Sequence, residues 1–277
     1  MKILVTGANG YIGRHVIKHL LDANHVVVAC DKAFSDIDDR AIKLDVNLFD
    51  IAAEELYENA GRPEVCLHLA WRNGFVHNDD SHILDISAHY ALLTGLARMG
   101  VRRIAVMSSM HEVGYHEGMI GEDTNCNPMS LYGVAKYSLR QALQLFCKHE
   151  NITLQWLRGY YIVGDDQHNH SIFTKLCQAE KEGKNTFPFT TGKCQYDFIG
   201  IEELSEQIAA VVAQDKVNGV IECCSGKPQS LASKVEDYIC QHGFKIRLDY
   251  GAFPDRPYDS PITYGDSRKI QCIMNQL

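Results

Sequence analysis

A glycine-rich segment near the start of the chain constrains the fold more than any other feature. The segment from Thr6 to Gly13, TGANGYIG, follows an apolar run at residues 2–6 and opens a stretch, residues 11–21, whose apolar side chains recur at helical spacing. Glycines between a strand and a helix allow a tight turn and let backbone N–H groups approach a pyrophosphate. The segment therefore predicts a dinucleotide site, with an ordinary glycine turn as the alternative. The expected contacts are Gly7, Gly10, Tyr11, Ile12 and Gly13.

The first half of the chain alternates between short apolar runs and stretches with helical spacing. Buried strands are expected at residues 2–6, 26–30, 42–44, 65–70, 103–107 and 153–158. Helices are expected at residues 11–21, 48–59, 81–99 and 130–149. Strands that are apolar on both faces and alternate with helices predict a parallel sheet covered on two sides, which is the doubly wound α/β class.

The pattern becomes less regular after residue 164. Helices are expected at residues 172–181, 202–214 and 230–242, and strands at residues 196–199 and 220–223. We therefore predict a dinucleotide-binding domain over residues 1–164. A smaller substrate-binding lobe is expected over residues 165–277, interleaved with the last elements of the sheet.

Composition is ordinary for a globular protein and excludes several functions. The 277 residues are 45% hydrophobic and 22% charged, and they contain no run of about 18 apolar residues that could span a membrane. Ten cysteines without a C-x-x-C pattern favour free thiols in a reducing cytoplasm. The net charge of −8 argues against nucleic-acid binding, and the 13 histidines form no zinc signature. We expect a cytoplasmic protein without a membrane, nucleic-acid or metal partner.

Acidic residues follow the second and third predicted strands. Asp31 comes 18 residues after Gly13, where a carboxylate can accept both ribose hydroxyls of an adenosine and repel a 2′-phosphate. This favours NAD over NADP, although the cation at Lys32 can accept the phosphate and leaves NADP open. Asp45 and Val46 close the third strand, where the carboxylate either reaches the adenine amino group or caps a helix.

The sharpest chemical pattern is Tyr132 followed by Lys136 in a predicted helix. Residues four apart share a helix face, so the lysine ammonium is expected to lower the pKa of the phenol and to hold the nicotinamide ribose. The tyrosine then serves as general acid or base toward a carbonyl or hydroxyl oxygen. Ser109 ends the fifth strand at the carboxyl edge of the sheet, where its hydroxyl either binds the same oxygen or caps the strand end.

Together these motifs resemble the extended short-chain dehydrogenase/reductase family, the NAD-dependent epimerase/dehydratase enzymes of nucleotide sugars. The resemblance covers nearly the whole chain. Its landmarks are the TGxxGxxG loop, Asp31, His68-Leu69-Ala70, Ser108-Ser109, Pro128 before Tyr132 and Lys136, Leu157-Arg158, Tyr196-Asp197-Phe198-Ile199 before Glu202-Glu203-Leu204, and Arg256-Pro257-Tyr258-Asp259. The resemblance implies a Rossmann fold and an NAD(P)-dependent reaction on a nucleoside-diphosphate sugar. It implies Ser109, Tyr132 and Lys136 as catalytic residues, with Ser109 and Tyr132 also touching the substrate.

The resemblance implies further contacts as well. Leu69 and Ala70 would pass under the cofactor, and Tyr160 would line the nicotinamide pocket. Arg256 would clamp the substrate diphosphate, with a surface ion pair as its alternative role. Relatives pair through helices like those at residues 81–99 and 130–149, which implies a homodimer.

Two departures from the family pattern lie beside Ser109. Members usually carry the catalytic hydroxyl three residues before the valine of a V-Y-G triplet. Counted from Val113, that position is Met110, so assigning the role to Ser109 requires an insertion of one residue. Sugar dehydratases carry an Asp-Glu pair directly after the hydroxyl. Here His111 and Glu112 follow Met110, so the pair is incomplete and the roles of His111 and Glu112 stay open.

Other departures concern the substrate side. Tyr196 stands where relatives carry a phosphate-binding arginine, and Asp85 replaces an asparagine. The chain is also short for the family, which implies a trimmed substrate lobe.

Several reactions share this set of residues. The missing dehydratase pair, the short lobe and the altered serine segment favour reduction of a nucleoside-diphosphate 4-keto-6-deoxyhexose, as in deoxysugar synthesis for surface polysaccharide or glycosides. The main alternative is a 4-epimerase, which oxidises C4, rotates the keto-sugar and reduces its other face. A 4,6-dehydratase is less favoured. A non-catalytic NAD sensor is least favoured, because such proteins typically lose the tyrosine or the lysine.

Overall fold

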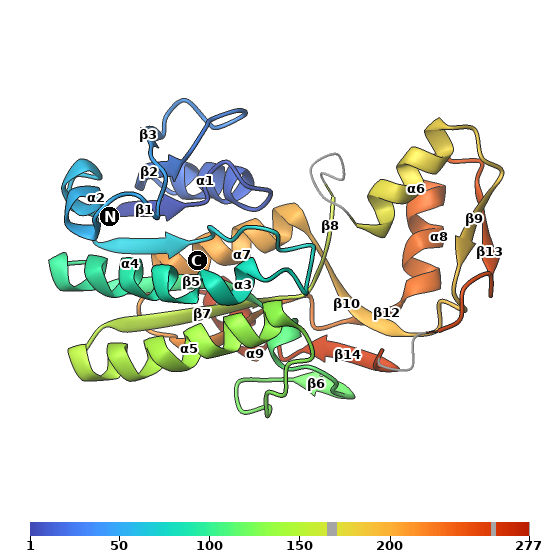
Figure 1. Ribbon diagram of the computed structural model, residues 1–277. Helices are drawn as coiled ribbons and strands as arrows, with labels where there is room; N and C mark the ends of the chain where they lie inside the picture. Colours follow the sequence, from blue (N-terminus) through green and yellow to red (C-terminus); the bar gives the residue numbers. More distant parts are fainter. Residues whose placement is uncertain (165–170, 256–258, 277) are drawn as a thin grey trace.

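A parallel sheet forms the centre of the larger part of the molecule (Figure 1). The computed structural model describes residues 1–164, 171–255 and 259–276. Within these residues the sheet has seven strands, and every neighbouring pair is parallel. In spatial order they are β11 (Gly219–Cys223), β7 (Thr153–Gly159), β5 (Arg103–Ser109), β4 (Val65–His68), β1 (Lys2–Thr6), β2 (Val26–Asp31) and β3 (Ile42–Asp45).

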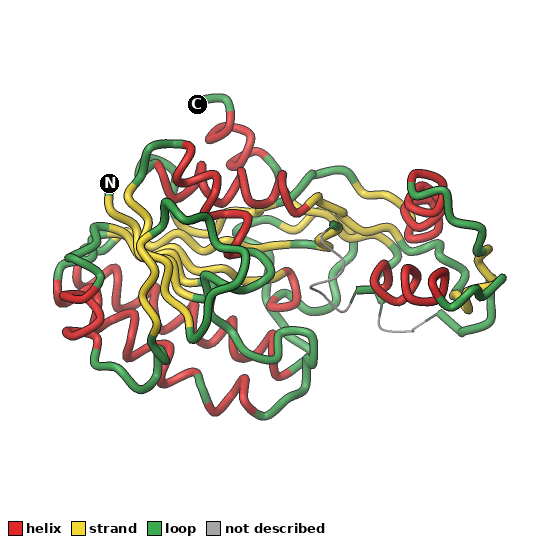
Figure 2. Tube along the Cα trace, turned by 90° about the horizontal axis from the view of Figure 1, so that it is seen from above, coloured by secondary structure: helices red, strands yellow, loops and turns green. Residues whose placement is uncertain are grey.

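Helices cover both faces of this sheet, as Figure 2 shows in the view from above. One face packs against α1 (Gly13–Asp22), α7 (Ile201–Ala213) and α9 (Arg268–Met274). The other face packs against α2 (Ala53–Asn59), α4 (Ile86–Met99) and α5 (Leu131–Glu150). The expected doubly wound α/β fold is therefore confirmed.

The central strand β1 shows why its sequence is apolar throughout. Ile3 and Val5 belong to the core under α1 and α7, whereas Leu4 belongs to the core under α2 and α4. All three side chains are fully buried. A strand with both faces covered has no place for the polar alternation of a half-exposed strand.

A smaller lobe projects from the carboxyl side of the sheet (Figure 1). Its sheet is built on β10 (Gln195–Gly200), which pairs with β8 (Tyr161–Val163), β12 (Pro228–Ser230) and β14 (Ile262–Gly265); β14 also pairs with β6 (Gly118–Ile120). At the far end β9 (Thr186–Phe189) pairs with β13 (Arg247–Tyr250) beside α6 (Ile172–Lys181) and α8 (Leu231–Gln241).

The structure differs from the sequence prediction at several elements. The helix expected over residues 81–99 is divided at Asp85 into α3 (Ser81–Leu84) and α4, and the helix expected from residue 48 begins only at Ala53. The strand expected over residues 65–70 ends at His68. The helix α9 and the short strands β6, β8, β9, β12, β13 and β14 were not predicted. Because β11, α7 and α9 pack into the first sheet, residues from both sides of position 164 build it. The domain boundary at 164 stays a prediction.

The described helices include none that is both long and apolar enough to cross a membrane.

The glycine loop is packed too tightly for side chains. Gly7 has a φ of +70°, and a Cβ atom there would lie 2.5 Å from the backbone nitrogen of Ala70. Gly13 has an ordinary φ, yet a Cβ atom on it would lie 2.5 Å from the carbonyl oxygens of Gly7 and Ala8. The loop therefore closes against both the first turn of α1 and the end of β4.

Gly7→Ala tests this packing, with Gly183→Ala as the matched control. Gly183 has nearly the same φ, +72°, but open space where its Cβ would lie. The control therefore carries only backbone strain of about 1–2 kcal/mol. Urea unfolding should show a larger loss of unfolding free energy for Gly7→Ala than for the control. Equal losses would mean that the contact with Ala70 does not constrain the loop.

Candidate active site

The glycine loop and the end of β2 form one end of the candidate site. Asp31 accepts a hydrogen bond from the backbone N–H of Asn9 (2.9 Å) and one from the N–H of Lys32 (2.8 Å). Asp45 lies opposite Asp31 in the strand register, and the N–H of Val46 donates to the carbonyl oxygen of Asp31 (3.0 Å). The predicted adenosine contacts thus gather at one edge of the sheet, next to the loop.

This end of the site fits a dinucleotide. Side chains are absent where Gly7 and Gly13 meet the neighbouring backbone, and the first turn of α1 offers N–H groups that the helix does not pair internally. The Asp31 carboxylate beside the loop suits ribose hydroxyls rather than a 2′-phosphate.

A cavity of about 970 Å³ runs from the glycine loop to the lobe. Most predicted site residues line it: Gly7, Gly10, Tyr11, Ile12, Gly13, Leu69, Ser109, Tyr132, Lys136 and Tyr160. Five do not: Asp31, Lys32, Asp45, Val46 and Ala70. Arg256 lies outside the described residues. A single cavity therefore joins the predicted cofactor loop to the predicted catalytic residues.

Tyr132 stands in the first turn of α5, whose start is held from two sides. The Ser130 hydroxyl caps the helix by accepting a hydrogen bond from the N–H of Gly133 (3.1 Å). The N–H of Tyr132 donates to the carbonyl oxygen of His77 (2.9 Å), which ties the helix to the loop after β4. These bonds fix where the phenol enters the cavity.

Lys136 is buried one turn further along α5. Its Nζ donates to the carbonyl oxygen of Met107 in β5 (2.8 Å) and lies 5.8 Å from the centre of the Tyr132 ring. Burial lowers the pKa of Lys136 to about 7, against a smaller opposing effect of the Glu112 carboxylate. A small change in its surroundings therefore changes its charge near neutral pH.

The predicted effect on the tyrosine is not seen. Burial raises the pKa of the Tyr132 phenol, with a smaller contribution from Glu112, whereas the sequence suggested that Lys136 lowers it. The desolvation of a partly enclosed phenol outweighs a cation that sits beside its ring. At neutral pH the phenol is protonated and can donate a proton.

Ser109 caps a short turn and also lines the cavity, while its contact with the substrate oxygen stays a prediction. Its Oγ accepts a hydrogen bond from the N–H of His111 (3.3 Å), so it caps the short 3₁₀ turn η1 (Met110–Glu112). It also lines the cavity with Tyr132. Met110, which occupies the family position by spacing, is buried with Val113 in a separate apolar cluster.

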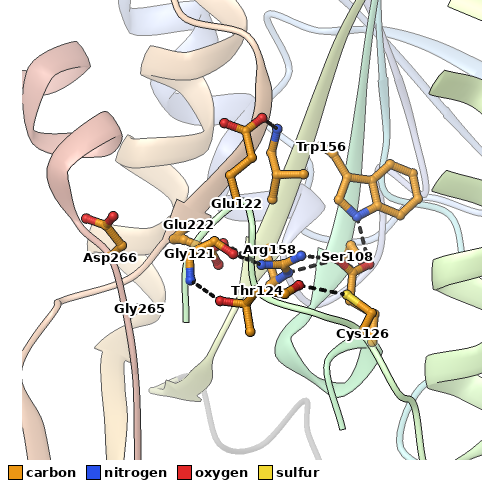
Figure 3. A network of polar contacts seen from close by, with 12 residues as sticks. Ser108, Gly121, Glu122, Thr124, Cys126, Trp156, Arg158, Glu222, Gly265 and Asp266 are labelled. Atoms are coloured by element: carbon orange, nitrogen blue, oxygen red, sulfur yellow. Dashed lines mark hydrogen bonds and ion pairs between the residues drawn. The ribbon is translucent and has the colours of Figure 1, made fainter. Parts of the chain in front are cut away.

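Glu112 is buried outside the cavity at the centre of a polar network. Its Oε1 accepts hydrogen bonds from Arg140 (2.9 Å) and Arg158 (2.8 Å). Its Oε2 accepts them from Ser108 (2.9 Å) and Trp156 (2.8 Å). Figure 3 shows Ser108, Trp156 and Arg158 among the residues of this network. With four donors and no exposed surface, Glu112 cannot serve a substrate as acid or base.

The network continues to the wall of the cavity. Arg158 also donates to Glu222 Oε1 (2.5 Å), and the Tyr160 hydroxyl donates to Glu222 Oε2 (2.8 Å). Tyr160 therefore lines the cavity as predicted but directs its hydroxyl into the buried network. Burial raises the pKa of Glu222 to about 7.

Sequence reasoning missed a layer of imidazoles around Tyr132. The ring of His77 stacks on that of Tyr132 with centroids 5.6 Å apart, and His82 and His111 meet it at 5.2 and 6.3 Å. Burial lowers the pKa of His77 and lowers that of His111 to about 4, so both rings are neutral at neutral pH. The available signal was the number of histidines between the fourth strand and the serine segment.

In the part of the chain that the structure describes, no three His, Cys, Asp or Glu side chains are grouped so that they could hold a metal ion.

This arrangement is that of a nucleotide-dependent oxidoreductase, with Ser109, Tyr132 and Lys136 as candidate catalytic residues at the carboxyl edge of a Rossmann sheet. The model of the NAD dependent epimerase/dehydratase family matches residues 3–224. The chain therefore belongs to this family, as its motifs indicated. The expected NAD-dependent nucleotide-sugar oxidoreductase is confirmed, with NAD as its cofactor.

Individual relatives agree with this assignment. The chain is 43% identical over 270 residues to dTDP-6-deoxy-L-talose 4-dehydrogenase (NAD(+)) of Aggregatibacter actinomycetemcomitans, covering 96% of this chain and 99% of the relative. A UDP-glucose 4-epimerase of Stenotrophomonas maltophila with bound NAD has a TM-score of 0.85 at 17% identity, covering 99% and 92% of the two chains. A UDP-N-acetylglucosamine 4-epimerase of Methanobrevibacter ruminantium M1 also has a TM-score of 0.85, at 21% identity, covering 98% and 91%. These two structures share the fold.

Glu112→Gln tests the buried network. The amide keeps the shape but loses the charge that faces Arg140 and Arg158, so the free energy of unfolding should fall by about 3–5 kcal/mol. Glu54→Gln, on the exposed side of α2, should change it by less than about 0.5 kcal/mol. Urea unfolding of both variants provides the measurement. A Glu112→Gln protein as stable as the control would show that the charge of Glu112 does not stabilise the fold.

Proposed function

We propose that the chain catalyses NADH-dependent reduction at C4 of a dTDP-linked 4-keto-6-deoxyhexose, together with the reverse oxidation by NAD⁺. One observation carries the proposal: Ser109, Tyr132 and Lys136 line the same cavity as the glycine loop, while Glu112 is withdrawn into the protein. The relative that is 43% identical is named for oxidation at C4 of dTDP-6-deoxy-L-talose, which is the reverse of such a reduction. Loss of Glu112 as acid or base weighs against the 4,6-dehydratase alternative.

The residues divide the chemistry as follows. NADH, when bound, supplies the hydride that C4 of the sugar receives. The protonated phenol of Tyr132 donates a proton to the oxygen that becomes the alcohol, and the Ser109 hydroxyl donates a hydrogen bond to that oxygen. Lys136 places a positive charge beside the phenol and favours its anion after the proton leaves.

The lobe supports recognition of the nucleotide. Its part of the cavity is lined by aromatic rings, among them Phe187, Phe189 and Phe253, which suit stacking against a base. Lys175 on α6 lines the same part and adds a cation for the diphosphate. Arg256, one residue beyond the lining residue Asp255, stays the predicted diphosphate clamp.

We also propose a homodimer that pairs through α4 and α5, in a cytoplasmic protein. The two helices lie side by side (Figure 1), and Arg98 of α4 covers the ring of Phe146 of α5 at 5.2 Å. Large apolar side chains remain outside this contact: Leu145 on α5 is 74% exposed and Leu84 on α3 is 72% exposed. All ten cysteines are free, which supports a reducing compartment.

The direct test is a paired assay with purified protein. Oxidation of dTDP-6-deoxy-L-talose with NAD⁺ should produce NADH, measured at 340 nm, and the resulting 4-keto sugar should consume NADH in the reverse direction. Because Asp31 repels a 2′-phosphate, NADH should be preferred to NADPH. Conversion between C4 epimers without net NADH change would instead support the 4-epimerase. NADH binding without turnover across a panel of nucleotide sugars would support the sensor.

Tyr132→Phe tests the proton donor. Loss of the phenol hydroxyl should lower kcat by about 10²–10⁴-fold, since general acid catalysis is removed. NADH affinity, measured by fluorescence titration, should change little. Tyr137→Phe removes a hydroxyl from the same helix, where the ring lies under Arg140, and should keep full activity. Near-normal turnover of Tyr132→Phe would refute the assignment.

A further inference from the structure

Trp71 lies against the catalytic lysine. It follows β4 at the carboxyl edge of the sheet and lines the cavity together with Tyr132 and Lys136. The Lys136 Nζ lies 3.6 Å from the centre of the Trp71 ring, and the Tyr132 ring meets the indole edge-on at 6.1 Å. An ammonium group at this distance over an indole is attracted by the negative face of the ring.

Two histidines hold the indole in place. His89 stacks on it with centroids 4.4 Å apart and an interplanar angle of 8°, and the indole N–H donates to His82 Nδ1 (3.0 Å). His89 is fixed by a hydrogen bond to His68 (2.8 Å), which in turn bonds Thr6 at the end of β1 (2.7 Å). A chain of contacts thus runs from the glycine-loop strand to Lys136.

His89 and His68 support the indole without adding charge. Burial lowers the pKa of His89 to about 3 and lowers that of His68 well below its usual range, with Lys136 as a smaller cause in both. Since both rings are neutral at neutral pH, they do not repel the ammonium. The indole that contacts Lys136 is therefore held in place by the neutral ring of His89.

We propose that Trp71 is a positioning residue, whose indole face keeps Lys136 charged and directed toward Tyr132. The inference rests on the proposed function of Tyr132 and Lys136. Within the described residues, the other groups that face Lys136 are the Met107 carbonyl on β5, Glu112 on η1, His68 on β4, His89 on α4 and Tyr132 on α5. The Glu112 carboxylate already accepts hydrogen bonds from four other side chains, and none of them comes from Lys136. The Met107 carbonyl accepts one hydrogen bond from the Lys136 Nζ. The indole face adds a contact that prefers the ammonium to the neutral amine.

The sign of the effect follows from this preference. Burial places the Lys136 pKa at about 7, so the lysine loses its proton as the pH rises through this value. An aliphatic side chain in place of the indole keeps Lys136 buried but lacks the negative ring face, so the charged form is destabilised and the pKa falls further. The expected downward shift is about 0.5 to 1.5 pH units for a desolvated contact with an indole.

The test is an NMR titration of the whole chain labelled with [¹³Cε]lysine. The Lys136 resonance is assigned by its absence from Lys136→Arg, and its midpoint is followed in wild type, Trp71→Leu and Trp71→Phe. Trp71→Leu should lower the midpoint by about 0.5 to 1.5 units, and Trp71→Phe, which keeps a smaller aromatic face, should lower it less. The alkaline limb of the kcat profile should move by the same amounts. A role in packing alone would lower kcat at every pH without moving either midpoint.

Phe49→Leu is the matched control, since its ring packs edge-on against His89 (4.9 Å) one layer further out. It should leave the midpoint of Lys136 unchanged. If Trp71→Leu does not fold, Trp71→Met, which keeps more bulk without an aromatic face, takes its place. An unchanged midpoint in a folded Trp71→Leu or Trp71→Met protein would overturn the proposal. If the midpoint shifts in the Trp71 variants but the wild-type protein turns over no nucleotide sugar, the result would support the positioning role of Trp71 and refute the proposed function.

Discussion

The carboxyl edge of the sheet depends on the buried carboxylate of Glu112. Two arginines, an indole N–H and the Ser108 hydroxyl converge on it, so the network ties together the end of β5, the end of η1, α5 and β7. Ser109 is the next residue after Ser108, and Lys136 lies one turn before Arg140 on the same helix. A buried charge lowers the stability of the folded state unless fixed partners compensate for its desolvation. The same fixed partners hold the serine and lysine of the candidate site in register.

Neutral imidazole rings lie next to this network. His68, His77, His89 and His111 are kept uncharged by burial, and they surround Tyr132, Trp71 and Lys136. The Lys136 ammonium lies beside the phenol, 5.8 Å from the centre of its ring. The site combines a protonated phenol with a lysine whose charge is sensitive near neutral pH. That combination suits delivery of one proton to a carbonyl oxygen.

The features that the sequence predicts correctly are those set by local pattern. Apolar runs such as residues 2–6 identify strands buried on both faces, and the glycine loop identifies the turn between the first strand and the first helix, whose contacts with the nucleotide stay a prediction. The division of α3 from α4 at Asp85 was missed, because apolar spacing continues across it. The short edge strands β9 and β13 carry too few residues for a periodic signal. Trp71 and Glu112 acquire their roles from residues distant in the sequence, so no local pattern could assign them.

A single passage of hydride between the cofactor and C4 of a nucleotide-linked 6-deoxyhexose defines the proposed reaction. It is tested most directly by incubating the enzyme with the 4-keto sugar nucleotide and [4-²H]NADH of each stereochemistry, followed by mass spectrometry and NMR of the sugar. One deuterium is expected at C4 from one of the two labelled forms, with one NADH consumed per product formed. A product without deuterium at C4, or epimers formed without NADH consumption, would contradict it.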